Sequence, residues 1–361
     1  MVFVSTKFWG SRTWLTAKLM ANTYDALILV SFGGPECRDD VLPFLENVLR
    51  GKPVPRERML EVAEHYYAFD GVSPINEQNR GLITALQQEF VDHGLDLPIY
   101  WGNRNWHPML TETLRQMAAD GVGRALAFVT SAFSSYSGCR QYREDIARAQ
   151  SAVGPTAPEV DNLRVFFNHP GFIEPMIDRL REGLARVPAE RRSAARLLFT
   201  AHSIPRSMAE NCRYEAQLHE ACRLVADGAG HPTWQLVYQS RSGSPQQPWL
   251  EPDICDVIRQ QHAQGDLVDL VVVPIGFMSD HMEVLFDLDT EAQQVCRTLG
   301  VNMLRIPTVG TDPRLVSMIR ELVEERQDDQ IERKALGEMG PSHDVCPSDC
   351  CLYTPSRAGS G

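Results

Sequence analysis

The chain has 361 residues, of which 43% are hydrophobic and 23% are charged, with 25 Gly and 23 Pro. This balance excludes intrinsic disorder, collagen and a disulfide-stabilised miniprotein, and the length suits one large domain or two smaller ones. The net charge of -12 argues against nonspecific binding of nucleic acid. An anionic small molecule would need a local cluster of Arg or Lys to hold it.

The first residues differ in composition from the rest of the chain. Residues 1–21 contain Lys7, Arg12 and Lys18 but no acidic residue, which superficially resembles a transit peptide. We favour translation from Met20, which would make these residues an upstream extension; a flexible tail is the alternative. No apolar run here or elsewhere is long enough to cross a bilayer, so we expect a soluble protein with peripheral membrane contact at most.

Short apolar runs alternate with helical patterns along the chain. This alternation is typical of βαβ units and predicts an α/β fold with mainly parallel sheets. The runs are nearly continuous in apolar residues, as expected of strands that helices cover on both faces. The predicted strands are Ala26 to Val30, Pro98 to Trp101, Ala125 to Val129, Val165 to Phe167, Leu197 to Thr200, Gln235 to Tyr238, Val268 to Ile275 and Met303 to Ile306.

A weak internal repeat divides the chain. In each half a strand leads into a polar loop with Trp and Pro, at 102–108 and at 240–252, and then into a helix and another strand. We therefore expect two similar Rossmann-like lobes, each with a mainly parallel sheet flanked by helices, and an active-site cleft between them. The expected division is an extension over 1–21, a first lobe over 22–160, a second lobe over 161–330 and a cysteine-bearing tail over 331–361.

Two loops that follow predicted strands are candidates for ligand binding. The loop Ser31 to Pro35 lacks both the dinucleotide-binding glycine pattern and the lysine of a P-loop, so we interpret it as a tight turn or a lip for a nonphosphate ligand. His202 ends another strand, at the sheet edge where such folds bind ligands. Its imidazole could accept a proton or bind a transition metal there; a structural histidine is the alternative.

Three carboxylates follow a buried strand at a spacing of four residues. On a helix, Glu283, Asp287 and Glu291 form one acidic row, and a wide π-type turn would keep that row straighter. A solvated helix face is the usual interpretation, but this row begins at the crevice end of a strand, among apolar side chains. Oxygen ligands in such a row could pass a divalent cation inward or relay protons outward.

Five ordered motifs resemble those of the ferrochelatases, from about Tyr24 to about Glu325. The family has two Rossmann-like lobes and inserts ferrous iron (Fe2+) into a porphyrin in haem synthesis. The resemblance implies that His202 and Glu283 are the active-site histidine and glutamate, with Asp287 and Glu291 in the acidic row. The motifs are Ser31-Phe32-Gly33-Gly34-Pro35, Gly71-Val72-Ser73-Pro74-Ile75-Asn76, Thr200-Ala201-His202-Ser203-Ile204-Pro205, Gln239-Ser240-Arg241-Ser242-Gly243 and Gly276-Phe277-Met278-Ser279-Asp280-His281-Met282-Glu283.

The resemblance also directs attention to side chains that could hold the porphyrin. Phe32 and Met278 are candidates for stacking on the macrocycle, and Arg241 and Arg104, its counterpart in the first lobe, for binding its carboxylates. Core packing and structural ion pairs are the alternatives for these residues. We expect coproporphyrin III, the substrate of the actinobacterial branch, in preference to protoporphyrin IX, and a cytoplasmic location. No pattern indicates an oligomeric state.

Other functions fit parts of the same pattern. A cobalt or nickel chelatase of the same fold is the nearest competing enzyme, although its members tend to present paired histidines where this chain has Glu283. A noncatalytic tetrapyrrole carrier or an iron–sulfur sensor would need no base. The presence of both His202 and the acidic row therefore favours an enzyme.

The 9 cysteines are too few and too scattered for a disulfide scaffold, and their odd number cannot all pair. Some ferrochelatases carry a [2Fe-2S] cluster bound by one internal cysteine and three near the C-terminus. By this resemblance Cys139 is the internal ligand, and Cys346, Cys350 and Cys351 complete four thiolates. Their close spacing departs from that of other members. A zinc site on the same thiolates and free thiols are the alternatives.

Overall fold

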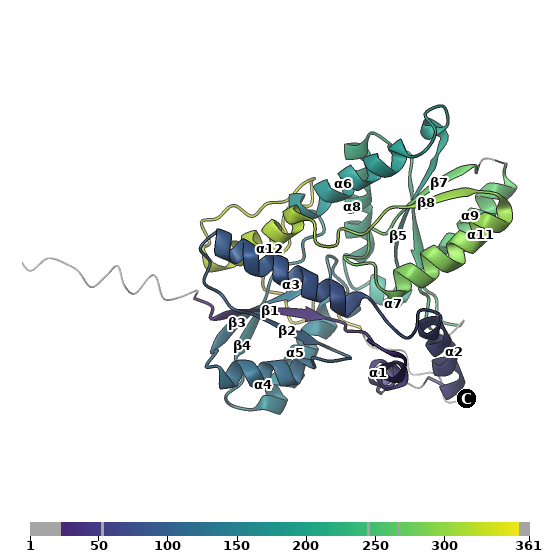
Figure 1. Ribbon diagram of the computed structural model, residues 1–361. Helices are drawn as coiled ribbons and strands as arrows, with labels where there is room; N and C mark the ends of the chain where they lie inside the picture. Colours follow the sequence, from purple (N-terminus) through teal and green to yellow (C-terminus); the bar gives the residue numbers. More distant parts are fainter. Residues whose placement is uncertain (1–22, 52–53, 244–245, 266, 354–361) are drawn as a thin grey trace, which may run out of the picture.

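The structure is a computed structural model that describes residues 23–353 except 52–53, 244–245 and 266, and it consists of two parallel sheets with helices on their faces (Figure 1). The proposed extension over 1–21 and the Met20 start lie outside the described residues. Within the described part of the chain, no helix combines the length and the apolar character needed to cross a bilayer.

The first sheet has the strand order β2-β1-β3-β4, with all neighbours parallel. Its elements are β1 (Ala26–Ser31), β2 (Ile99–Asn103), β3 (Arg124–Val129), β4 (Glu159–Asn162), α3 (Ile75–Asp92), α4 (Leu110–Ala119) and α5 (Gln141–Val153). Every residue of β1 is buried, because helices cover both of its faces. Leu27 and Leu29 share a core with α3, whereas Ile28 and Val30 share another with α4 and α5.

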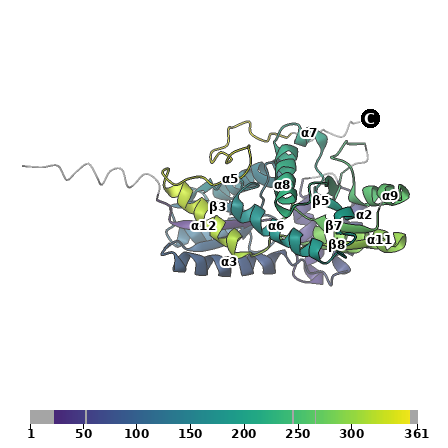
Figure 2. The ribbon, with the colours of Figure 1, turned by 90° about the horizontal axis from the view of Figure 1, so that it is seen from above.

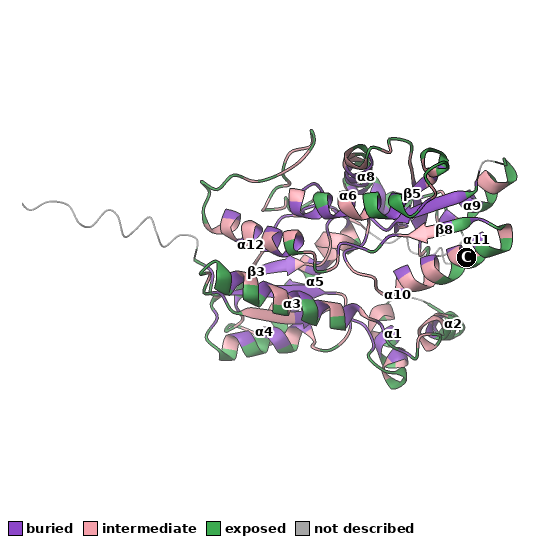
Figure 3. Cartoon of the chain, turned by 45° about the horizontal axis from the view of Figure 1, so that its top comes forward, coloured by how far each residue is buried: buried purple, intermediate pink, exposed green. Residues whose placement is uncertain are grey.

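The second sheet repeats this arrangement in the order β6-β5-β7-β8. Its elements are β5 (Arg196–His202), β6 (Gln235–Gln239), β7 (Asp269–Val273), β8 (Asn302–Arg305), α6 (Pro170–Ala185), α8 (Tyr214–Ala229), α9 (Ile254–Ala263) and α11 (Gln293–Leu299). Figure 3 shows the buried strands in the interior of each lobe and exposed residues on the outer helices. The predicted α/β fold with two similar lobes is confirmed.

The remaining helices and turns lie outside these two sets. They are η1 (Arg38–Asp40), α1 (Val41–Leu49), α2 (Arg56–Tyr67), η3 (Arg192–Ala194), α7 (Arg206–Ala209), α10 (Met282–Val284), α12 (Pro313–Gln327) and the π-helical turns η2 (Tyr136–Arg140) and η4 (Leu285–Ala292). In Figure 1, α1 and α2 stand apart from the first sheet and reach towards the second lobe. They pack on each other through Phe44, Leu45 and Met59.

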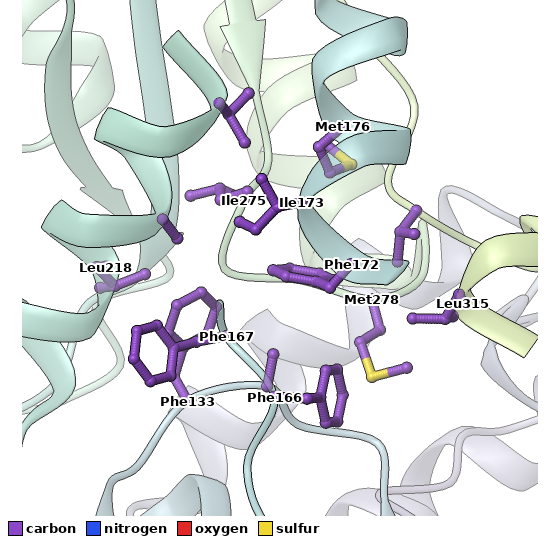
Figure 4. Close-up of a cluster of buried hydrophobic side chains, with 14 of the residues drawn as sticks. Phe133, Phe166, Phe167, Phe172, Ile173, Met176, Leu218, Ile275, Met278 and Leu315 are labelled. Carbon is purple, nitrogen blue, oxygen red and sulfur yellow. The ribbon is translucent and has the colours of Figure 1, made fainter. Parts of the chain in front are cut away.

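One predicted strand is wrong. The segment Val165 to Phe167 has no regular structure, and the fourth strand of the first sheet is the preceding β4, which runs past the expected lobe boundary at residue 160. Phe166 and Phe167 are each 1% exposed and enter the core between the lobes with Phe172 (Figure 4). The apolar run reflects this burial, while the backbone turns into α6 instead of pairing with a neighbour.

The end of the chain crosses both lobes. Helix α12 packs against α3 of the first lobe and α6 of the second. The tail then follows an irregular path, held by Asn168, which donates to the carbonyl oxygens of Leu336 and Gly340, each at 3.0 Å. Figure 2 shows this segment in yellow beside α5 and α8. It contacts Arg140, the last residue of η2 just before α5, and Glu220 of α8. The C-terminal cysteines are thereby carried to the start of α5.

Candidate active site

His202 and Glu283 meet at the carboxyl edge of the second sheet. His202 is the last residue of β5, and Glu283 lies in α10, just beyond the neighbouring strand β7. Nε2 of His202 is 3.8 Å from Oε1 of Glu283, and the two side chains are 32% and 43% exposed. Both residues predicted to be catalytic are therefore in contact and open to a ligand.

The surroundings of His202 fix the orientation of its ring. Nδ1 is hydrogen-bonded to the carbonyl oxygen of Ser203, so Nδ1 carries the proton and Nε2 presents a lone pair towards Glu283. The Tyr214 hydroxyl donates to the His202 carbonyl oxygen at 3.1 Å. Ser203 in turn donates through its hydroxyl to the carbonyl oxygen of Leu250 at 2.8 Å. The imidazole is thus preorganised as a proton acceptor or metal ligand.

The acidic row continues from Glu283 along the π-helical turn η4, which carries Asp287 and Glu291. A wide π-type turn, which keeps such a row straighter, is present here. Gln239 donates to the Glu283 carbonyl oxygen at 3.1 Å and to Asp287 Oδ2 at 3.3 Å. The Ser240 hydroxyl also donates to Asp287 Oδ2, from a backbone with φ of 61°, a conformation uncommon outside glycine. The end of β6 therefore holds the middle of the row.

Electrostatics sets Asp287 apart from an ordinary surface carboxylate. Burial raises the pKa of Asp287 to about 7; its hydrogen bond from Ser240 opposes this rise, and the negative charges of Glu283 and Glu291 add to it. Burial also raises the pKa of Glu291, helped by the charge of Asp253. Carboxylates crowded in this way favour a bound proton or a cation among them.

A pocket of about 460 Å³ opens beside the outer part of the row. Asp287 and Glu291 line it together with Asp253, which caps the N-terminus of α9. The sequence analysis missed Asp253; its signal is an acidic residue at the N-cap position of the helix after Pro252. These oxygen donors suit a hydrated divalent cation.

Helices α2 and α3 of the first lobe contact the second lobe close to the acidic row. The ring of His65, on α2, stacks on Phe286 with centroids 3.7 Å apart and planes 11° apart. Gln78, on α3, donates to the carbonyl oxygen of Asp280 at 3.1 Å. His65 was not identified from the sequence, because its partner lies more than two hundred residues away.

Of the proposed substrate arginines, Arg104 already has a carboxylate partner. Its guanidinium forms an ion pair with Asp145 on α5, and its side chain is 7% exposed. It also lies over the rings of Phe32, at 5.7 Å, and Tyr142, at 4.5 Å. Phe32 itself is half-buried and meets Phe44 edge to face.

Arg241 and Met278 have different surroundings. Arg241 is 39% exposed, lies 4.0 Å from Glu251 and donates to the carbonyl oxygen of Gln247 at 3.3 Å. Met278 is 8% exposed and lies in the core near Phe166, Phe172 and Leu315 (Figure 4). Of these two, Arg241 is the side chain open to a ligand.

The four cysteines singled out from the sequence come together beside α5. Cys139, in η2, has its Sγ 3.9 Å from that of Cys351, which is 3.6 Å from Sγ of Cys350. Donor atoms of Cys346 and Cys350 lie within 4.8 Å of each other and of a ring nitrogen of His343, a residue the sequence analysis missed. The hydrogen bond between the Cys139 and Cys351 thiols lowers the pKa of Cys139 to about 7.

An arginine next to Cys139 holds the cysteine segment in place. Arg140 Nη1 donates to the carbonyl oxygens of Ser348, at 2.8 Å, and Cys350, at 2.9 Å. The first lobe thereby fixes the backbone that carries the three C-terminal thiols. All nine cysteines are free thiols.

The paired lobes, the His–Glu contact and the row of carboxylates define a two-lobed α/β metal chelatase. The fold is similar to that of "SirB from Bacillus subtilis with Fe3+", with a TM-score of 0.50 and 11% identity over 86% of this chain and 99% of that one. A family profile for ferrochelatase matches residues 24–327, and the chain belongs to this family of enzymes, which insert ferrous iron into a porphyrin in haem biosynthesis. The resemblance noted in the sequence is confirmed.

Two curated relatives are similar over nearly their whole length. A ferrochelatase of Rhodopirellula baltica is 62% identical over 334 residues, which cover 92% of this chain and 95% of that protein. A coproporphyrin III ferrochelatase of Streptomyces coelicolor is 53% identical over 363 residues, which cover 94% of this chain and 96% of that protein.

Proposed function

We propose that this chelatase inserts Fe2+ into coproporphyrin III in the cytoplasm, with His202 and Glu283 as its catalytic pair. The observation that carries the proposal is the 3.8 Å contact between His202 Nε2 and Glu283 Oε1 at the edge of the second sheet, where a row of carboxylates begins. The cytoplasmic location is supported by the closely spaced thiols, which an oxidising compartment would convert to disulfides.

The reaction needs two kinds of group. Two pyrrole N–H protons must leave the macrocycle as Fe2+ enters, so that a neutral porphyrin and Fe2+ give the iron porphyrin and two protons. With Nδ1 bonded to Ser203, Nε2 of His202 is free to accept a proton or contact the metal. Glu283 takes the complementary role, and the two groups act as one coupled unit.

Asp287 and Glu291 are proposed to deliver the cation. Both carboxylates line the outer pocket, and the shared helical face leads from them to Glu283. The pKa values of Asp287 and Glu291 are raised because their own negative charges are poorly solvated. A dipositive ion bound between these carboxylates therefore stabilises the row. The row therefore offers Fe2+ a path from the pocket to the catalytic pair.

Substrate contacts are proposed for Phe32, stacking on the macrocycle, and for Arg241, binding a propionate. For Arg104 we propose an indirect contact with the substrate. Its guanidinium is paired with Asp145 and lies against the ring of Phe32, so it supports Phe32 from beneath. Because Met278 is buried in the core, its proposed contact is limited to packing behind the site. The preference for coproporphyrin III is supported by relatives of that name, such as the one from Streptomyces coelicolor.

The function is tested by anaerobic incubation of the purified protein with Fe2+ and either coproporphyrin III or protoporphyrin IX, followed by the visible spectrum of the product. We expect a higher kcat/KM with coproporphyrin III. A higher value with protoporphyrin IX would overturn the substrate preference alone. Metalation of neither porphyrin with Fe2+, or metalation only with Co2+ or Ni2+, would overturn the proposed reaction.

We also propose that Cys139, Cys346, Cys350 and Cys351 hold a [2Fe-2S] cluster. The donor set fits: tetrahedral coordination with metal–sulfur bonds of about 2.3 Å separates two thiolates on one iron by about 3.8 Å. Cys351 Sγ is 3.6 Å from Cys350 Sγ and 3.9 Å from Cys139 Sγ, so it is placed to share an iron with one of them. Such a cluster would supply one-electron chemistry and a covalent tie between the tail and the first lobe.

The cluster is tested by iron and acid-labile sulfide analysis together with visible absorption. Cys350→Ser should bleach a brown protein, whereas Cys37→Ser, which alters an exposed thiol outside the cysteine site, should leave the colour unchanged. Unchanged absorption in Cys350→Ser would remove that residue from the ligand set. Zinc without sulfide in the wild-type protein would contradict the cluster.

A further inference from the structure

The cysteine site contains one more metal-binding side chain than a four-thiolate cluster uses. Donor atoms of His343, Cys346 and Cys350 all lie within 4.8 Å of one another. His343 Nε2 is 3.9 Å from Cys350 Sγ. Cys351 Sγ is 3.6 Å from Cys350 Sγ and 3.9 Å from Cys139 Sγ. The tail therefore holds a group of three donors in His343, Cys346 and Cys350, and Cys351 connects this group to Cys139 of the first lobe.

We infer that His343, Cys346 and Cys350 form a binding site for a single divalent transition-metal ion. Thiolate and imidazole donors at bond lengths of about 2.3 and 2.0 Å lie about 3.5–3.8 Å apart around a tetrahedral metal, so closing this group requires shifts of about 1 Å. Cys350 Sγ and His343 Nε2, at 3.9 Å, are already close to that range. This mixture of ligands selects Zn2+, Fe2+ or Co2+ and excludes Mg2+ and Ca2+.

The sequence spacing supports the same site. His343 and Cys346 are separated by two residues, and Cys346 and Cys350 by three, within the short separations typical of structural metal sites. With three protein ligands, the fourth position is left for water. A metal ion with two thiolates and a neutral imidazole has no net charge, which suits a site that is only half-buried.

The two metal sites differ in what must fold before they form. All three donors of the single-ion site come from residues 343–350, whose backbone Arg140 holds at Ser348 and Cys350. Arg333 also secures this segment, through an ion pair with Asp344 at 3.0 Å. A cluster additionally needs Cys139, which the fold must bring from the first lobe. Since the sites share Cys346 and Cys350, a bound single ion excludes the cluster.

This sharing gives a crossed set of variants in the full-length protein, with Co2+ as an optical probe under anaerobic conditions. Cys139→Ser removes a ligand that only the cluster uses. His343→Ala removes one that only the single-ion site uses, and Cys350→Ser removes one common to both. His93→Ala, at an exposed histidine on the far end of α3, is the matched control for His343.

We expect Cys139→Ser to lack the cluster and to bind one thiolate-coordinated Co2+ per chain, with thiolate-to-cobalt charge transfer and the visible bands of tetrahedral cobalt. Adding His343→Ala to that variant should weaken this thiolate-coordinated binding at least tenfold, whereas adding His93→Ala should not change it. Cys350→Ser should show neither thiolate-to-cobalt charge transfer nor a cluster. His343→Ala alone should retain the cluster wherever the wild-type protein has one.

Two results would overturn the inference: no thiolate-to-cobalt charge transfer in Cys139→Ser, or equally tight binding of that Co2+ with and without His343. Loss of the cluster in His343→Ala would also overturn it, because His343 would then serve the cluster. The test of the single-ion site and the test of the proposed cluster can fail independently. A wild-type protein without acid-labile sulfide would refute the cluster, while Co2+ binding to Cys139→Ser would still decide the single-ion site.

Discussion

Nε2 of His202 lies 3.8 Å from Oε1 of Glu283, and this contact links the carboxyl end of β5 to α10, which follows the neighbouring strand β7. The other ring nitrogen of His202 is occupied by the Ser203 carbonyl group. His202 therefore presents the lone pair of Nε2, and Glu283 presents its carboxylate, to the same part of the site. In the proposed reaction, these two side chains share proton transfer and metal contact.

Replacing His202 by Ala should lower kcat by about 10²- to 10⁴-fold, the usual contribution of a positioned general base. Porphyrin binding should stay measurable by fluorescence quenching, since the proposed stacking and propionate contacts are unchanged. Anaerobic iron-insertion assays give kcat. His219→Ala, on the outer helix α8, is the control. A wild-type rate in His202→Ala would refute its proposed role.

Ser240→Ala should move the acidic limb of the pH profile of kcat/KM to higher pH. The Asp287 pKa is about 7, and the hydrogen bond from Ser240 holds it below the value that burial alone would produce. Below that pH the carboxyl group takes a proton and no longer attracts Fe2+, so activity falls. Loss of the hydrogen bond raises the pKa and extends this fall to higher pH.

The measurement is kcat/KM between pH 5 and 9 at fixed ionic strength. Ser242→Ala is a matched control, because Ser242 is an exposed serine in the same loop. The same midpoint in Ser240→Ala and the wild-type protein would show that Asp287 does not control the acidic limb.

Local patterns were sufficient for most of the fold and for the acidic row. A strand buried on both faces, such as β1, has a continuous apolar run, and carboxylates four residues apart share a helix face whatever surrounds them. The strand predicted at Val165 to Phe167 was wrong because an irregular segment that is buried has the same continuous apolar run. Apolar character reports burial, and backbone pairing has to be inferred separately.

Contacts between distant segments could not be predicted in the same way. An arginine such as Arg104 can bind a substrate carboxylate, and the sequence does not show that it already has a partner. Its ion pair with Asp145 forms only because α5 packs beside the loop after β2. His343 was not identified as a ligand, although its spacing to Cys346 and Cys350 is short, because its place in a metal site is apparent only once the tail has folded against Cys139 and Arg140. Tertiary packing decides which polar side chains already have an ion-pair or hydrogen-bond partner within the protein.

Glu325→Ala should destabilise the protein by about 3–5 kcal/mol, the usual cost of leaving a buried charge without its partner. Arg164 and Glu325 form a bidentate ion pair at 2.8 and 3.0 Å, with side chains 1% and 4% exposed. Urea unfolding measures the change. Glu332→Ala, at an exposed position shortly after α12, should change stability by less than about 0.5 kcal/mol. Equal stabilities of the two variants would contradict the prediction.

Tyr353→Phe should raise KM for the porphyrin about 2- to 10-fold and leave kcat unchanged. Gln247 donates to the Tyr353 hydroxyl at 3.1 Å, and its carbonyl oxygen accepts from Arg241 at 3.3 Å, so the tail supports the loop that carries the proposed propionate ligand. One hydrogen bond of about 0.5–1.5 kcal/mol accounts for the magnitude. The loss concerns binding because no reacting atom is touched.

Initial rates over a range of porphyrin concentrations separate KM from kcat. Tyr100→Phe removes a comparable hydroxyl that donates to Asp120 at 2.9 Å on the opposite side of the first lobe, and both constants should be unchanged in it. A lower kcat with an unchanged KM in Tyr353→Phe would show that the tail acts on the chemical step. An unchanged KM and kcat would show that Arg241 is positioned without the tail, or that Arg241 does not bind the propionate.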